Sequence, residues 1–168
     1  MEILKDQETM EARIRELGAE ITAIYKDQPL TMLVVMNGGL FFGAKLAEAI
    51  AVEDFFIDSI SASSYKHHSS TGNVELRSFM KLDVKGRHLL ILDEVLDTGR
   101  TLKKIKEKLL DQGALSVKTV VLVEKTIPRP EGIDHADWAG FQMEDRYLIG
   151  CGMDSDEKYR NLPYIAVY

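Results

Sequence analysis

The chain is poor in cysteine, with Cys151 as its single example among 168 residues. It therefore cannot form a disulfide within itself, and zinc modules built from cysteine pairs are excluded. No apolar run reaches the roughly 18 residues that a membrane span requires. The first stretch, MEILKDQETMEARIREL, is rich in charge and lacks the apolar segment of a secretory signal. These absences predict a protein of the reducing cytoplasm that does not bind a membrane.

Basic residues are also in the minority. Lys and Arg number 21 and Asp and Glu 27, which gives a net charge of -6 and a pI near 5.3. Proteins that bind nucleic acid usually present a basic surface, so we expect no nucleic-acid partner. Hydrophobic residues make up 45% and charged residues 29%, as in folded rather than disordered chains. The length predicts a single domain over residues 1–168.

Apolar runs and segments of helical periodicity alternate along most of the chain. Strands are expected at residues 30–36, 55–62, 88–92 and 116–125. Helices are expected at residues 9–26 with Thr9 as N-cap, at 40–52, and at 101–113 with Gly113 as the stop signal. Strand, helix and strand in this order predict right-handed crossovers. The fold class is therefore α/β, with a mainly parallel sheet flanked by helices.

Two further segments differ from this pattern. Residues 55–62 and 74–80 flank the polar stretch SSYKHHSSTGN, as the arms of a long hairpin would. After Pro128 the chain becomes irregular, and short strand candidates lie between Trp138 and Tyr168.

The most informative stretch is HLLILDEVLDTGRTL, residues 88–102. A buried strand ends in Asp93 and Glu94, at the edge where open α/β sheets bind their ligands. The turn that follows leads into a helix, whose N-terminus attracts phosphate through free N–H groups and a partial positive charge. Gly99 allows the backbone to approach a ligand closely, and Thr98 and Thr101 add hydroxyl donors. This turn is therefore a candidate phosphate site.

The acids limit the kind of ligand. They would repel a phosphate directly, so we expect them to hold sugar hydroxyls or a divalent cation. The Walker pattern GxxxxGK[ST] is missing, which argues against ATP hydrolysis of that kind. Two other interpretations remain open on the residues alone. Asp-Thr-Gly after a strand can be a helix N-cap and nothing more, and a receiver domain also places acids at strand ends, although in a different order.

HLLILDEVLDTGRTL resembles the phosphoribosyl-pyrophosphate (PRPP) loop of type I phosphoribosyltransferases. Four more segments, in order along the chain, resemble the hypoxanthine-guanine branch of that family. They are VVMNGGLFFGAKL as its pyrophosphate loop, SASSYKHHSSTG as its mobile catalytic loop, VLVEKTIPRP as the strand of its purine-reading lysine, and AGFQMEDRYLIGCGMDSDEKYRNLPYI as its C-terminal hood. The resemblance implies the type I phosphoribosyltransferase fold. Its core would span about residues 28–126, and a small hood would combine the N-terminal segment with about 127–168.

The resemblance also implies an activity. Members of the branch use Mg²⁺ to transfer 5-phosphoribosyl from PRPP to hypoxanthine or guanine, giving IMP or GMP and pyrophosphate in purine salvage. The family usually assembles as homodimers or homotetramers, and we expect one of these states.

Individual residues acquire implied roles in the same way. The 5′-phosphate would be bound by Asp97, Thr98, Gly99, Arg100 and Thr101. Pyrophosphate would be bound by Asn37, Gly38, Gly39 and Arg160, and the purine by Lys125, Tyr147, Leu148 and Asp154. Ribose hydroxyls and magnesium would face Asp93 and Glu94, with Asp154 near a second metal. Catalysis would involve Asp97 as general base or acid at purine N7, and Ser64 and Tyr65 as a cover over the reacting centre.

The sequence departs from the family at two places. The family usually has Glu before Asp in the acid pair, whereas this chain has Asp93 before Glu94, which changes the reach of each side chain by one methylene. Relatives often carry Arg or Lys where Asn37 stands. The missing cation predicts weaker pyrophosphate binding unless Lys66, His67 or Arg160 compensates.

Two rival functions remain open. One is a guanine- or xanthine-preferring relative, because the sequence does not fix the backbone near the purine 2-position. The other is a regulator that binds PRPP without catalysis, since a fold alone does not determine chemistry. The presence of Asp97, Ser64, Tyr65 and Lys125 together favours an enzyme.

Overall fold

The computed structural model describes residues 1–63, 75–77 and 80–168. A six-stranded sheet has the order β4-β3-β2-β5-β6-β7, and a three-stranded sheet has the order β1-β9-β8. In the large sheet β3, β2, β5, β6 and β7 are parallel, and β4 pairs antiparallel with β3. The predicted α/β class with a mainly parallel sheet is confirmed.

The central strands are long, and the buried parts of β2, β5 and β6 are mainly apolar because helices cover both faces of the sheet there. The central strands are β2 (Leu30–Met36), β3 (Phe55–Ser63), β5 (His88–Leu96) and β6 (Ser116–Lys125). The edge strands are β4 (Glu75–Arg77) and β7 (Trp138–Met143). The predicted strands at 30–36 and 116–125 have the observed bounds. The strand expected at 88–92 is longer than predicted and continues through both acids.

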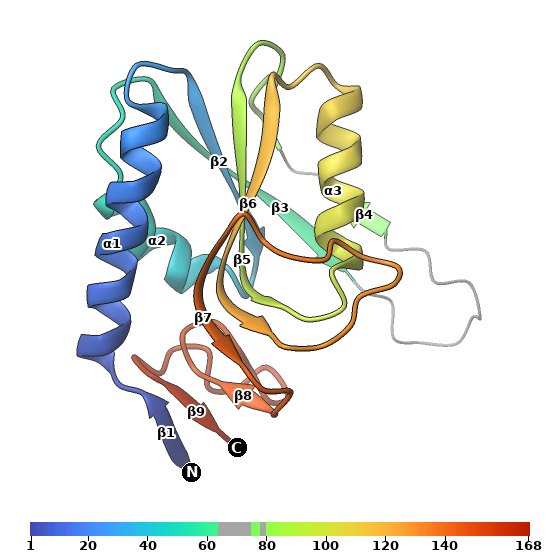
Figure 1. Ribbon diagram of the computed structural model, residues 1–168. Coiled ribbons are helices and arrows are strands. Elements are labelled where there is room, and N and C mark those ends of the chain that lie inside the picture. Colours follow the sequence, from blue (N-terminus) through green and yellow to red (C-terminus); the bar gives the residue numbers. More distant parts are fainter. Residues whose placement is uncertain (64–74, 78–79) are drawn as a thin grey trace.

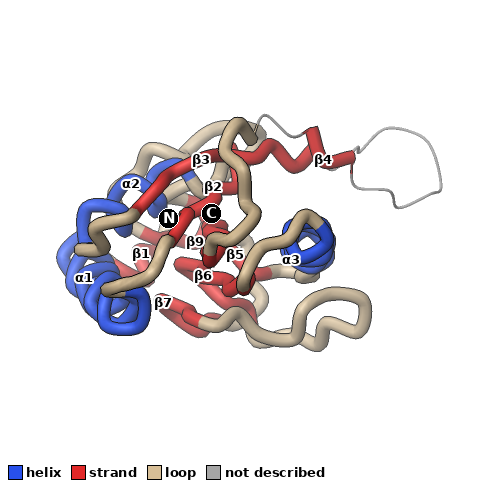
Figure 2. The backbone as a smooth tube through the Cα atoms, turned by 90° about the horizontal axis from the view of Figure 1, so that it is seen from above, coloured by secondary structure: helices blue, strands red, loops and turns tan. Residues whose placement is uncertain are grey.

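In the described part of the chain, three helices cover the two faces of this sheet. They are α1 (Gln7–Tyr25), α2 (Leu40–Ala49) and α3 (Arg100–Asp111). Figure 1 and the perpendicular view in Figure 2 place α1 and α2 on one face and α3 on the other. Successive residues of β5 point to opposite faces of the sheet. Leu90 packs in the core cluster that contains α1 and α2, and Ile91 packs in the cluster that contains α3.

Helix α1 begins earlier than the sequence suggested. Asp6, rather than Thr9, is its N-cap, and the Asp6 carboxylate accepts a hydrogen bond from the Thr9 N–H at 2.8 Å. The cap lies there because the buried stripe already starts at Met10, one turn before Ile14. The stop signal predicted for α3 is confirmed, since Gly113 has a φ of 91° just beyond the helix.

The small sheet joins the two ends of the chain. Strand β1 (Glu2–Lys5), which the sequence did not suggest, pairs antiparallel with β9 (Ile165–Val167), and β9 pairs with β8 (Leu148–Ile149). Figure 1 shows this sheet beyond one end of the large sheet, with both termini on it. Across the described ranges, no helix is both long and apolar enough to cross a membrane.

Candidate active site

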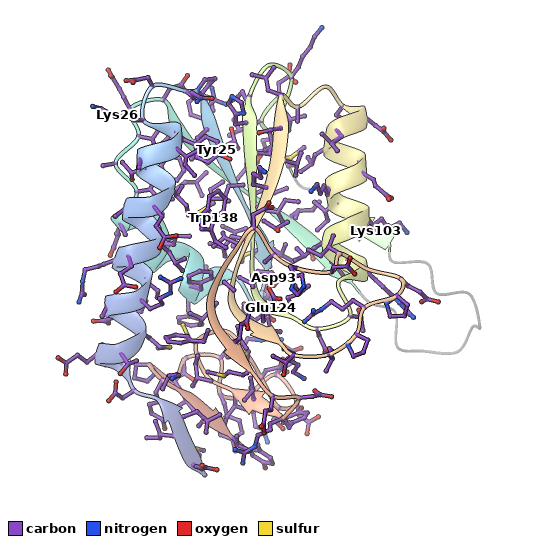
Figure 3. All side chains as sticks on the ribbon, viewed as in Figure 1. Tyr25, Lys26, Asp93, Lys103, Glu124 and Trp138 are labelled. Atoms are coloured by element: carbon purple, nitrogen blue, oxygen red, sulfur yellow. The ribbon has the colours of Figure 1, made fainter. Side chains whose placement is uncertain are left out.

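Three neighbouring parallel strands end at the same edge of the large sheet, and each delivers residues that the sequence singled out. Strand β2 ends at Met36 before Asn37, and their peptide bond is cis. Strand β5 carries Asp93 and Glu94 near its end, and β6 ends at Lys125. Figure 3 shows Asp93 and Glu124 in this region of the large sheet, on the side toward the small sheet. The order of the strands therefore brings together the pyrophosphate-loop, PRPP-loop and lysine segments.

The turn after β5 is shaped by close packing against a later loop. Gly99 has a φ of 72° and is the N-cap of α3. A Cβ atom on Gly99 would lie 2.7 Å from the Ile133 carbonyl oxygen, and one on Gly132 would lie 2.0 Å from the Thr98 carbonyl oxygen. Glycine at both positions lets the two loops touch. Beside the turn is a cavity of about 90 Å³, lined by Asp93, Val95, Leu96, Asp97, Thr98, Gly99, Thr101 and Leu102.

The first turn of α3 provides the features of an anion site. The N–H groups at a helix N-terminus have no partner within the helix, and the helix dipole makes this end positive. Arg100 forms an ion pair with Glu131 of the adjoining loop. The cavity and the helix terminus thus occur where the sequence placed the phosphate.

The two acids of β5 interact with each other. Burial of the Asp93 carboxyl raises its pKa well above the usual value, and the charge of Glu94 and a hydrogen bond between the two side chains raise it further. The Asp93 carboxylate also accepts a hydrogen bond from the Glu94 backbone N–H at 2.9 Å, which acts in the opposite direction. Two carboxylates this close repel each other when both are charged, so the pair favours a cation or hydroxyl donors beside it.

Glu94 also connects the acid pair to the pyrophosphate-loop segment. A Cβ atom on Gly38 would lie 2.1 Å from the Glu94 carboxyl group, and one on Gly152 would lie 1.9 Å from the Gly38 carbonyl oxygen. Gly152 in turn accepts a hydrogen bond from Arg160 at 2.7 Å. Asn37, Gly38, Gly39 and Arg160 therefore belong to one packed region, which adjoins the acids.

Lys125 is held between two carboxylates. Its ammonium nitrogen lies 2.8 Å from an oxygen of Asp145 and 3.6 Å from an oxygen of Asp97. Only 14% of the Lys125 side chain is exposed, whereas Asp97 and Asp145 are open to solvent. The sequence predicted that Lys125 and Asp97 both act at the purine, and the structure brings their side chains together. The sequence did not single out Asp145.

Arg129 is a second residue that sequence reasoning missed. It is buried, and its guanidinium donates hydrogen bonds to four backbone carbonyls: Asp97 at 2.7 Å, Asp134 at 2.8 Å, Leu96 at 3.2 Å, and Lys125. These carbonyls come from the end of β5, the end of β6 and the loop that follows. The only signal in the sequence was an arginine between two prolines, which excludes regular structure but predicts no partner.

The remaining candidates come from the C-terminal part of the chain. Leu148 is buried in β8, while Tyr147 is exposed and its ring meets that of Tyr168 edge-on, with centroids 6.4 Å apart. Asp154 forms an ion pair with Arg160 at 3.0 Å. Within the described part of the chain, no three His, Cys, Asp or Glu side chains form a metal-binding group. Ser64 and Tyr65 fall outside the described residues.

Comparison with known proteins gives one consistent family. The phosphoribosyl transferase domain family matches residues 1–157. The hypoxanthine-guanine-xanthine phosphoribosyltransferase of Tritrichomonas foetus is 36% identical over 167 residues, which covers 98% of this chain and 90% of the relative. The hypoxanthine-guanine phosphoribosyltransferase of Bacillus subtilis is 36% identical over 168 residues, covering 98% and 91%.

A solved structure extends this likeness to the fold. A variant of the hypoxanthine phosphoribosyltransferase of Trypanosoma cruzi, complexed with the product IMP, superimposes with a TM-score of 0.90 at 30% identity. The match covers 99% of this chain and 90% of that one. The predicted type I phosphoribosyltransferase fold is thereby confirmed.

Proposed function

The chain belongs to the phosphoribosyl transferase family, and we infer that its activity is that of the hypoxanthine-guanine branch. It serves purine salvage: the bond between the anomeric carbon of PRPP and pyrophosphate breaks, a bond from that carbon to a purine nitrogen forms, and pyrophosphate leaves. The products from hypoxanthine and guanine are IMP and GMP. The observation that carries this proposal is the meeting of the acid pair, the Gly99 turn and Lys125 at one edge of the sheet.

The 5′-phosphate is assigned to the turn from Asp97 to Thr101. A phosphate there would accept hydrogen bonds from the first N–H groups of α3 and would benefit from the positive end of the helix dipole. The positive φ of Gly99 and the cavity of about 90 Å³ beside it support this placement. The hydroxyls of Thr98 and Thr101 and the guanidinium of Arg100 are the side-chain donors in the same turn.

Asp93 and Glu94 are assigned to the ribose hydroxyls and to Mg²⁺. Protein-bound Mg²⁺ typically uses one or two carboxylates and completes its shell with water and substrate oxygens, which suits a pair of adjacent acids. The adjacency of the two carboxyl groups supports this, because a divalent cation between them would offset their mutual repulsion. When bound, the metal stabilises negative charge on the leaving pyrophosphate as a Lewis acid. Asp154 would have to leave Arg160 before it could join such a site.

The purine is assigned to the space beside Lys125. The ammonium group donates to the 6-oxo oxygen, an acceptor that adenine lacks. Asp97 exchanges a proton with purine N7 as general acid or base, and its position 3.6 Å from Lys125 supports a role at the same base. Tyr147 stacks on the ring and the backbone of Leu148 reads its edge. The exposed Tyr147 side chain leaves its ring face accessible.

Pyrophosphate is assigned to Asn37, Gly38 and Gly39 with Arg160. The Glu94 carboxyl group fills the place that a Cβ on Gly38 would take, so a pyrophosphate bound by this backbone would lie next to the acids assigned to the metal. Arg160 supplies a cation to this loop. Relatives often carry their cation at the position of Asn37 instead. Ser64 and Tyr65 keep their predicted role as a cover that excludes water.

The remaining proposals concern organisation. The core and the hood form a single domain, in which the small sheet closes the site. A second copy covers an apolar groove of about 420 Å³ between β2, β3 and α2, lined in part by Met36, Leu40, Ala44 and Ile57. Leu40 and Ile57 are exposed in the single chain, which supports a homodimer or a tetramer built from it. We place the protein in the cytoplasm, where its free cysteine stays reduced.

A steady-state assay tests the activity. Pyrophosphate release is measured with PRPP, Mg²⁺ and each of hypoxanthine, guanine, xanthine and adenine. We expect turnover with hypoxanthine and guanine to exceed that with adenine by at least about 100-fold, because adenine leaves the buried lysine without its acceptor. Preference for xanthine would favour the xanthine-type rival. Tight PRPP binding without any turnover would identify a regulator and contradict the proposal.

A further inference from the structure

The purine-reading lysine has more negative charge around it than its role requires. Two carboxylates, Asp97 and Asp145, flank the ammonium group of Lys125. Asp97 already has a proposed part in the reaction, whereas Asp145 lies in the turn between β7 and β8 and has none. Arg146, the neighbouring cation, forms an ion pair with Glu2 at 2.9 Å. The Arg129 guanidinium bonds to the backbone carbonyls of Lys125 and Asp97 and not to their side chains, so both ion-pair partners of the ammonium group are negative.

The geometry still leaves the lysine able to bind a purine. An ammonium group has three N–H donors in a tetrahedral arrangement. Asp145 accepts one of them at 2.8 Å, and Asp97, at 3.6 Å, lies beyond hydrogen-bond distance. At least one donor can thus point to a 6-oxo oxygen while Asp145 keeps its contact. Asp145 orients the ammonium group and partly cancels its charge.

We propose that Asp145 determines specificity by disfavouring anionic bases. The inference rests on the proposed function, since it assumes that Lys125 contacts the purine. Hypoxanthine and guanine are neutral near pH 7, whereas xanthine loses a proton close to neutral pH. A second carboxylate beside the lysine repels the xanthine anion and leaves a neutral 6-oxopurine unaffected. Asp145 therefore selects hypoxanthine and guanine against xanthine.

The test compares two substitutions in adjacent residues. Asp145→Asn removes the charge but keeps an oxygen acceptor for Lys125, and Glu144→Gln removes an equal charge from a neighbouring exposed side chain. With saturating PRPP, kcat/KM is measured for xanthine, hypoxanthine and guanine. We expect Asp145→Asn to raise the ratio of xanthine to hypoxanthine about three- to tenfold, as one nearby and partly screened charge would. The same ratio should change less than about twofold in Glu144→Gln, because Lys125 forms its ion pairs with Asp97 and Asp145 and not with Glu144.

A third variant separates charge from shape. Asp145→Glu keeps the negative charge on a longer side chain, so its ratio should stay near that of the wild type. The Asp145 side chain is 61% exposed, so these substitutions leave the core intact. An unchanged ratio in Asp145→Asn, with normal use of hypoxanthine by the wild type, would overturn this inference alone. An equal rise in both Asp145→Asn and Glu144→Gln would also overturn it. Absence of turnover with every 6-oxopurine would instead overturn the proposed function.

Discussion

Lys125 and Asp97 form an ion pair at the active edge of the sheet, with 3.6 Å between the ammonium nitrogen and a carboxylate oxygen. They come from different strand ends, since Lys125 closes β6 and Asp97 follows β5 directly. The parallel pairing of these strands sets the two side chains side by side. The proposed purine-reading group and the proposed proton-transfer group can therefore act on the same ring.

Replacement of Asp97 by Asn should separate chemistry from binding. The amide keeps the size of the side chain but cannot exchange a proton at purine N7. We expect kcat to fall about 10²- to 10⁴-fold, as for other positioned acid–base groups, while the dissociation constant of PRPP changes little. Single-turnover rates and equilibrium PRPP binding measure the two quantities. Wild-type turnover in this variant would show that Asp97 is not the acid–base group.

Replacement of Lys125 by Ala should affect the purine far more than PRPP. The variant loses a charged hydrogen bond to the 6-oxo oxygen and leaves Asp97 and Asp145 without their shared cation. We expect kcat/KM for hypoxanthine to fall about 10- to 100-fold, with the KM for PRPP nearly unchanged. Steady-state kinetics with each substrate varied in turn checks this. Equal losses for both substrates would contradict a purine-reading role.

The sequence predicted those parts of the fold that depend on local pattern. The runs at 30–36 and 116–125 became β2 and β6 with the expected bounds, because each is centred on a run of apolar and mostly β-branched residues. Strand β1 was not predictable in this way. It is four residues long, contains two charges, and exists through pairing with β9 at the other end of the chain.

The same limit applies to the site. Asp93, Glu94 and the Gly99 turn could be identified from the sequence, because they lie between an apolar run and a segment of helical pattern. Asp145 and Arg129 could not be identified in this way, because their partners are set by how later loops fold back on β5 and β6.

The N-cap of α1 shows the same limit on a small scale, in the choice between Thr9 and Asp6. Both can cap a helix, and the start of the buried stripe at Met10 decided between them.

If a second copy covers the apolar groove, a charged substitution in that groove should lower the mass of the protein in solution. Ile57→Asp places a charge in the apolar groove beside α2, where a second copy would have to desolvate it. We expect the variant to shift from the oligomer to a smaller species in size-exclusion chromatography with light scattering. Leu115→Asp is the control, since Leu115 is similarly exposed, at 58% against 54%, and is not among the residues lining the groove. A monomeric wild type would rule out the contact.

The Cys151 thiol should react slowly in the folded protein, and its contribution to stability should change only at alkaline pH. Burial raises the pKa of its thiol from the usual 9.0 to about 11. At pH 8 the folded protein should therefore react with a thiol reagent about 100-fold more slowly than the urea-unfolded chain, because less thiolate is present. A raised pKa favours the folded state below about pH 9, and that contribution is lost as the pH rises from there to about 11. The difference in unfolding free energy between wild type and Cys151→Ala should shrink over this window, and a constant difference would contradict it.

Arg129 should support both stability and turnover, because it ties the start of the PRPP loop to the end of β6. Arg129→Ala leaves the carbonyls of Leu96, Asp97, Lys125 and Asp134 without their shared donor. We expect the free energy of unfolding to fall by on the order of 3 kcal/mol, from a lost buried charge and its hydrogen bonds. Because Asp97 and Lys125 lose a common anchor, kcat should fall about tenfold or more in the protein that remains folded.

Arg13 provides the matched control for this prediction. Its guanidinium also donates to two backbone carbonyls, those of Ala139 and Gly140 at 3.1 and 3.0 Å, but it does so from α1 to β7. Arg13→Ala should lower the unfolding free energy while kcat of the folded protein stays near that of the wild type. Chemical denaturation and active-site-normalised kinetics give the two values. If both variants lose stability and neither loses kcat, Arg129 is a structural residue only, and Asp97 and Lys125 do not depend on it for their positions.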